Sequence, residues 1–122
     1  MAKRILLVED HKDALSILVL IVRSFGYDTI EATTGADAVE KAFFANPNLI
    51  VMNMSLPDMT GINAAKAIKE NPSTSGVPII AYSGWSTGTW MEQAAKVGIA
   101  AYLVKPVTMA LLKETIQEYI LP

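Results

Sequence analysis

Four short apolar runs punctuate the chain, at residues 5–8, 49–52, 79–82 and 101–104. Each is rich in Ile, Leu or Val and is bounded by polar residues, Gly or Pro. Continuous apolar runs of this kind are typical of strands that a parallel sheet buries on both faces. A fifth segment, residues 29–32, alternates apolar and polar positions, so we expect a strand at one edge of the sheet.

Helical periodicity fills the stretches between the runs, because apolar residues recur there at intervals of three and four. We expect the first helix to end at Gly26, the second at 46–47 and the third near 71–72. Gly98 stops the fourth helix, and Thr108 is the expected N-cap of the fifth. The expected buried stripes are Leu15, Leu18, Val22 and Phe25; Ala36, Val39, Ala42 and Phe43; Ile62, Ala65 and Ile68; a poorer one within 89–97; and Leu111, Leu112, Ile116 and Tyr119.

Strand followed by helix, five times, predicts an α/β fold with a doubly wound, five-stranded parallel sheet. This is the flavodoxin-like (βα)5 arrangement in three layers. No linker or repeat interrupts residues 1–122, so we expect one domain and no output domain. Ligands of such sheets bind beyond the carboxyl ends of the strands, which makes the residues after each apolar run the ones of interest.

Composition narrows the class of protein. The 122 residues carry a net charge of −2 and no basic stripe, which argues against direct contact with nucleic acid. Without cysteine there are no disulfides and no thiolate metal sites. No apolar stretch is long enough for an export signal or a membrane span, so we expect a cytoplasmic protein.

The residues that follow the strands suggest phosphate chemistry. Glu9 and Asp10 are adjacent carboxylates that repel each other unless a cation lies between them, and Mg²⁺ prefers such oxygen ligands. Lys105 follows the last strand and offers a positive charge, while Ser83 offers a hydroxyl donor. Acidic groups for a metal, a lysine and a hydroxyl together predict a site for a phosphoryl group.

Two other kinds of site fit the sequence less well. Ser83, His11 and Asp10 contain the residue types of a hydrolytic triad, but no nucleophile-elbow glycine pattern surrounds Ser83. The residues around Thr34 and Gly35 do not form a glycine-rich phosphate loop, which argues against nucleotide or flavin binding.

Four segments resemble the signatures of response-regulator receiver domains of two-component signalling: ILLVEDH (5–11), LIVMNMSLPDMTG (49–61), PIIAYSG (78–84) and GIAAYLVKP (98–106). They occur in the family's order and spacing and span residues 5 to 106. The resemblance implies that Glu9, Asp10 and the backbone carbonyl of Ser55 hold Mg²⁺. It also implies that Ser83 and Lys105 contact the phosphoryl group.

Three further positions acquire roles from the resemblance. Pro106 matches the proline that usually follows a cis bond, and Tyr102 matches the aromatic switch that swings inward on activation. Asn53 matches the aspartate that accepts phosphate from a histidine kinase or phosphotransfer protein. Trp85 lies two residues past Ser83, where it either limits water access to the phosphoryl group or packs on the fourth helix.

Asn53 is the departure from the family pattern. A carboxamide oxygen is neutral and a poor nucleophile, and its lack of charge weakens Mg²⁺ binding. We therefore expect no phosphorylation of this chain and a switch held in its inactive arrangement. Either the substitution was introduced to freeze a working receiver, or the chain is a natural pseudo-receiver that binds partners without phosphorylation.

The first helix is apolar around most of its circumference, which suggests a second partner surface. In receivers this helix docks the phosphodonor helices of a histidine kinase or phosphotransfer protein, and Ala14 and Ile17 are the candidate contacts here. The alternative is a homodimer, formed through this helix or through the fourth helix, fifth strand and fifth helix.

Overall fold

The computed structural model describes residues 2–122. Its five strands form one sheet in the order β2-β1-β3-β4-β5, and every neighbouring pair is parallel. The strands are β1 (Arg4–Val8), β2 (Asp28–Ala32), β3 (Leu49–Met52), β4 (Ile79–Ser83) and β5 (Ala101–Val104). The predicted parallel sheet is confirmed, with the alternating strand at an edge as expected.

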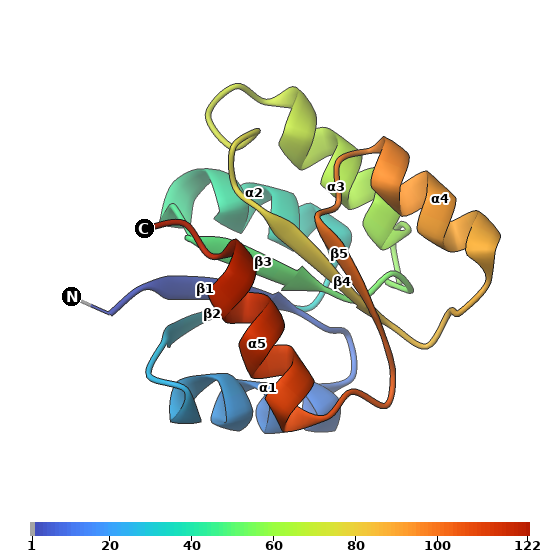
Figure 1. Ribbon diagram of the computed structural model, residues 1–122. Coiled ribbons are helices and arrows are strands. Elements are labelled where there is room, and N and C mark those ends of the chain that lie inside the picture. Colours follow the sequence, from blue (N-terminus) through green and yellow to red (C-terminus); the bar gives the residue numbers. More distant parts are fainter. Residues whose placement is uncertain (1) are drawn as a thin grey trace.

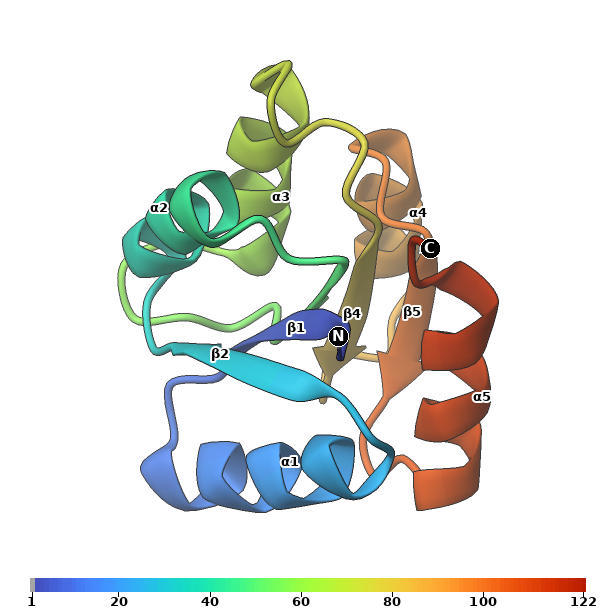
Figure 2. The same ribbon diagram turned by 90° about the vertical axis from the view of Figure 1, so that its left-hand side faces the viewer.

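A helix follows each strand, and the helices cover both faces of the sheet (Figure 1). Helices α1 and α5 lie on one face, and α2, α3 and α4 lie on the other, as Figure 2 also shows. The helices are α1 (Lys12–Ser24), α2 (Gly35–Ala45), α3 (Gly61–Glu70), α4 (Gly88–Lys96) and α5 (Met109–Tyr119). The three-layer architecture is therefore the predicted one.

The sheet separates two hydrophobic clusters. Alternate residues of the buried strands point to opposite faces, so Leu6 and Ile50 belong to the cluster under α2, α3 and α4. Ile5 and Val51 belong to the cluster under α1 and α5. All four side chains are fully buried, which explains why the strands read as continuous apolar runs.

Local signals set most helix ends where the sequence predicts them. The Thr108 hydroxyl accepts a hydrogen bond from the Leu111 amide at 3.1 Å and so caps α5. Gly26 has φ +98° just after the C-cap of α1, and Asn46 adopts φ 49° as the C-cap of α2. Asn71 is the C-cap of α3.

The buried stripe of α2 differs from the predicted one. Ala42 is buried as predicted, but Phe43 is 44% exposed and Ala36 is also exposed. Gly35 and Ala38 face the core instead. Small residues are needed there because α2 packs closely against its neighbours, so a Cβ on Gly35 would lie only 2.6 Å from the Met59 sulfur. Periodicity alone favoured the larger Phe43, and close packing decided otherwise.

Two further stripes can be compared with the structure. In α5, Leu112 and Ile116 are buried as predicted, but Leu111 is 45% exposed. In α3, all three predicted residues are buried.

Within residues 2–122, no helix combines the length and hydropathy that crossing a membrane requires.

Candidate functional site

The predicted site residues lie at the carboxyl edge of the sheet. Glu9, Asn53 and Lys105 each extend the backbone ladder just beyond a strand. The Glu9 amide donates to the Ala32 carbonyl at 3.0 Å, and the Asn53 amide donates to the Val8 carbonyl at 3.0 Å. The Lys105 amide donates to the Ser83 carbonyl at 2.8 Å. Because β1 lies between β2 and β3, the chain changes direction across the sheet here, which is where such sheets bind ligands.

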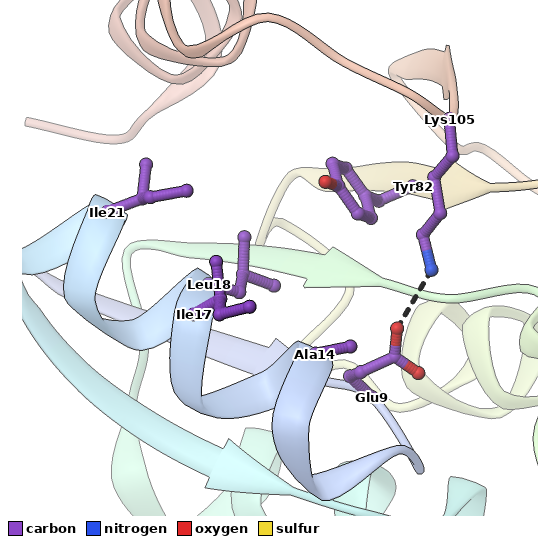
Figure 3. A pocket seen from close by; sticks show the side chains of 7 residues that line it. All are labelled: Glu9, Ala14, Ile17, Leu18, Ile21, Tyr82 and Lys105. Atoms are coloured by element: carbon purple, nitrogen blue, oxygen red, sulfur yellow. Dashed lines mark hydrogen bonds and ion pairs between the residues drawn. The ribbon is translucent and has the colours of Figure 1, made fainter.

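Glu9 and Lys105 form a partly buried ion pair, in which Glu9 is buried and Lys105 reaches solvent. The Lys105 Nζ atom lies 2.8 Å from Glu9 Oε1, and the two side chains meet although they are 96 positions apart (Figure 3). Burial alone would raise the pKa of Glu9, but the hydrogen bond from Lys105 and the charge of that lysine lower it. Glu9 therefore stays ionised inside the molecule. The peptide bond between Lys105 and Pro106, which follows this ion pair in the chain, is cis.

The Asn53 side chain points its amide nitrogen into the acidic cluster. Its Nδ2 atom donates to Glu9 Oε2 at 3.0 Å, to the Ser55 carbonyl at 3.1 Å and to Asp10 Oδ1 at 3.4 Å. The residue is only 6% exposed. Exchanging the nitrogen with the amide oxygen would place an acceptor against three acceptors, so the chemistry of the surroundings fixes this orientation.

Ser83 and Tyr102 are linked through the backbone of Trp85. The Trp85 amide donates to Ser83 Oγ at 3.0 Å, and the Tyr102 hydroxyl donates to the Trp85 carbonyl at 2.7 Å. Tyr102 is half-buried and packs inward against the core beneath α4. Trp85 stacks on Trp90 of α4 at 4.3 Å between ring centroids, so it packs on the fourth helix.

Sequence reasoning missed Asp58, which holds the loop between β3 and α3. Its carboxylate accepts hydrogen bonds from the amides of Gly35 at 2.8 Å and Ala36 at 3.0 Å, at the start of α2. These bonds lower the pKa of Asp58. The same loop carries the Ser55 carbonyl, so α2 helps to place that oxygen. Its partners lie 23 and 22 positions away, and no local pattern reveals the pairing.

A groove of about 200 Å³ runs from the ion pair along α1. Figure 3 shows Ala14, Ile17 and Ile21 on α1 facing Tyr82 and Lys105. Ile17 is 58% exposed, so this helix presents apolar surface beside the site, as predicted. Tyr82, which the sequence did not single out, lines the groove, and burial with the Glu9 charge raises its pKa.

His11 lies next to the acidic pair, with Nδ1 3.5 Å from Asp10 Oδ1. One carboxylate oxygen of Glu9, one of Asp10 and a ring nitrogen of His11 lie within 4.8 Å of one another. Within residues 2–122, no hydrogen bond joins His11 to Ser83, whose hydroxyl is bonded to Trp85 instead. The geometry therefore agrees with the sequence in disfavouring a hydrolytic triad.

Comparison with known proteins decides the family. The model of the response regulator receiver domain matches residues 5–117, which is nearly the whole chain. The chain belongs to the response regulator receiver domain family. Receiver domains are signalling switches rather than enzymes, and they bind Mg²⁺ at an acidic cluster.

Similar receivers are known from several bacteria. The polar-differentiation response regulator DivK of Brucella ovis is 28% identical over 120 residues, which are 98% of each chain. The receiver domain of the sensor histidine kinase PA1611 of Pseudomonas aeruginosa is 29% identical and has a TM-score of 0.90, with 98% of each chain covered. In that structure a magnesium ion is coordinated in the active-site cleft. The chemotaxis protein CheY4 of Vibrio cholerae, 24% identical with a TM-score of 0.92 over 98% of this chain and all of its own, shares the fold.

Proposed function

We propose that this chain is a cytoplasmic phosphorelay receiver in which position 53 is the phosphoacceptor position and Asn53 blocks the transfer. The observation that carries the proposal is the ring of groups around position 53. Glu9 and Asp10 lie within hydrogen-bonding distance of the Asn53 side chain. Ser83 is the last residue of β4 and Lys105 follows β5, which are the next two strands of the sheet. This combination suits a transferred phosphoryl group and little else.

An aspartate at position 53 would attack the phosphorus atom of a phosphohistidine on a histidine kinase or phosphotransfer protein. The bond between phosphorus and the imidazole nitrogen breaks as the acyl phosphate forms. Lys105 and Ser83 then bind phosphoryl oxygens through their Nζ and Oγ donors. Mg²⁺ held by Glu9, Asp10, the side chain at position 53 and the Ser55 carbonyl would supply compensating charge to the same oxygens.

Asn53 removes this chemistry. The carboxamide has no charged oxygen to attack phosphorus, and its N–H groups face the oxygens that would hold the metal. Mg²⁺ binding is weakened for the same reason. The chain as it stands therefore keeps the receiver architecture without the nucleophile.

The exposed face of α1 is the docking surface for the phosphodonor. Ala14 and Ile17 are exposed at the rim of the groove that leads to Lys105, so a partner helix placed there would bring its histidine toward position 53. In an Asn53→Asp protein, Ile17→Glu should slow phosphotransfer from a protein donor and leave phosphorylation by acetyl phosphate unchanged. Equal slowing with both donors would contradict docking through Ile17 and point instead to damage within the pocket.

A second candidate function is a phosphorylation-independent interaction module. The inward position of Tyr102 favours it, because Ser83 and Tyr102 are both already hydrogen-bonded to the Trp85 backbone without an acyl phosphate. Such a module holds one conformation and binds its partner, or a second copy of the chain, constitutively.

The two functions differ in the response of an Asn53→Asp variant. With Mg²⁺ and acetyl phosphate, a receiver gains one labile phosphate, and beryllofluoride changes its Trp85 fluorescence. The matched control Asn53→Asp/Lys105→Met keeps the nucleophile but lacks the lysine, and it should lose most of the phosphate uptake. An Asn53→Asp variant that stays unphosphorylated and spectroscopically unchanged, although folded and able to bind Mg²⁺, would favour the constitutive module.

A further inference from the structure

The nitrogen of the Asn53 side chain occupies the centre of an oxygen cage. Its three neighbours come from two separate parts of the chain: Glu9 and Asp10 after β1, and the Ser55 carbonyl in the loop after β3. Asn53 is more than nine-tenths buried, and its amide is aimed directly into the cage. An amide with two hydrogens and three acceptors within 3.4 Å is fully engaged.

The cage oxygens are those that the proposed function assigns to Mg²⁺, and they do not fit a metal in this arrangement. A cation and an N–H donor compete for the same oxygen lone pairs, and Mg²⁺ needs those oxygens at roughly 2.0–2.1 Å around its own centre. The amide nitrogen already holds that centre. Its hydrogens carry partial positive charge, so they repel a cation where the oxygens would attract one.

The remaining charge in the cage is partly compensated without a metal. The other oxygen of Glu9 is bonded to the Lys105 ammonium at 2.8 Å, and Asp10 is in part open to solvent. Swinging the Asn53 oxygen toward the cage would break all three amide hydrogen bonds. It would also leave two carboxylates and a carbonyl facing that oxygen.

We propose that the Asn53 amide nitrogen takes the place of the divalent cation, so that the pocket is held together without metal. This inference rests on the proposed function, because that function identifies the cage oxygens as the metal ligands. The asparagine thus acts as a built-in substitute for Mg²⁺ that links β1 to the loop after β3. If Asn53 were instead a weak ligand of Mg²⁺, removing its side chain would weaken Mg²⁺ binding, whereas removing a substitute for the cation should strengthen it.

The order of Mg²⁺ affinities tests this directly. Isothermal titration of the chain and of its Asn53→Ala and Asn53→Asp variants should give the tightest binding for aspartate, intermediate binding for alanine and the weakest for asparagine. The Asn53→Ala variant should bind Mg²⁺ several-fold more tightly than the unsubstituted chain, because the alanine empties the cage and leaves the other ligands in place. If Asn53 instead acts as a ligand through its oxygen, alanine binds Mg²⁺ no better than asparagine, which would overturn the proposal.

Two further measurements secure the result. Asn53→Ala/Asp10→Ala should lose the gain of the alanine variant, and a double variant that keeps the gain would place the metal elsewhere and overturn the proposal. In the unsubstituted chain, millimolar Mg²⁺ should leave the melting temperature and the side-chain amide resonances of Asn53 unchanged. A shift of those resonances overturns the proposal even if the alanine variant fails to fold.

Failure of the proposed function is distinguishable from failure of this inference. An Asn53→Asp protein that binds Mg²⁺ in the expected order but takes up no phosphate from acetyl phosphate contradicts the receiver function alone. In the other case, the Asn53→Asp protein is phosphorylated, but the unsubstituted chain binds Mg²⁺ as tightly as the Asn53→Ala variant does. That result contradicts only the inference that the Asn53 amide takes the place of the cation.

Discussion

Within residues 2–122, Lys105 is the only lysine or arginine that forms an ion pair with the Glu9 carboxylate. Replacing Lys105 with methionine removes this positive charge. Methionine keeps most of the side-chain length and leaves Glu9 ionised and buried without its partner. Breaking a buried ion pair from one side typically costs about 3–5 kcal/mol. The Lys105 side chain is 29% exposed, so solvent screens part of the interaction, and we expect a loss of about 2–3 kcal/mol.

Urea denaturation in EDTA at neutral pH measures this loss in the free energy of unfolding. Lys113→Met is the matched control, because Lys113 lies on α5, is exposed, forms no ion pair within residues 2–122 and lies 5.8 Å from the centroid of the Phe25 ring. We expect the control to change stability by no more than about 0.5 kcal/mol. The double variant Glu9→Gln/Lys105→Met should recover roughly 1–2 kcal/mol relative to Lys105→Met, because it removes the uncompensated charge.

The pH dependence provides a second check with a defined sign. The folded pKa of Glu9 is lowered from 4.5, so its stabilising contribution is present above that pH and is lost as the pH falls through the folded pKa. Without Lys105, burial raises the pKa, and protonation on acidification then stabilises the variant. The gap to the unsubstituted chain should therefore narrow as the pH falls. A loss below about 0.5 kcal/mol that is also additive in the double variant would refute the pairing argument.

Three other predictions follow from single contacts. Asp58→Asn should flatten the dependence of melting temperature on pH below 3.8, because the lowered pKa of Asp58 means that its contribution is lost only in that acidic range; an unchanged slope would argue against a stabilising role of the hydrogen bonds that Asp58 accepts from Gly35 and Ala36. Gly61→Ala should cost about 2 kcal/mol in urea denaturation, since its Cβ would lie 2.5 Å from the Asn53 carbonyl and 2.9 Å from the Met54 Cα atom. Tyr102→Phe should cost about 1 kcal/mol and shift Trp85 fluorescence through loss of the bond to the Trp85 carbonyl; unaltered emission and stability would contradict the inward position.

The sequence by itself determined the order and type of the elements. Strands such as β3 are buried on both faces and must be apolar throughout, and helix ends such as Thr108 and Asn46 depend on hydrogen bonds and backbone angles within a few residues. These are local requirements, so a single sequence displays them. The position of the site also followed, because parallel strands bring their carboxyl ends to one edge of the sheet.

Only the tertiary structure decided how the site residues use their atoms. The family resemblance predicts a nucleophile at the position of Asn53. The direction of the Asn53 amide, however, depends on oxygens 44, 43 and 2 positions away, of which two belong to another strand's end. Asp58 and Tyr82 gained their roles in the same way, through partners brought close by folding. The packing of α2 against its neighbours likewise left Phe43 exposed. The orientation of a side chain depends on all the charges and volumes around it. Folding brings these neighbours together only when the sheet and its helices assemble.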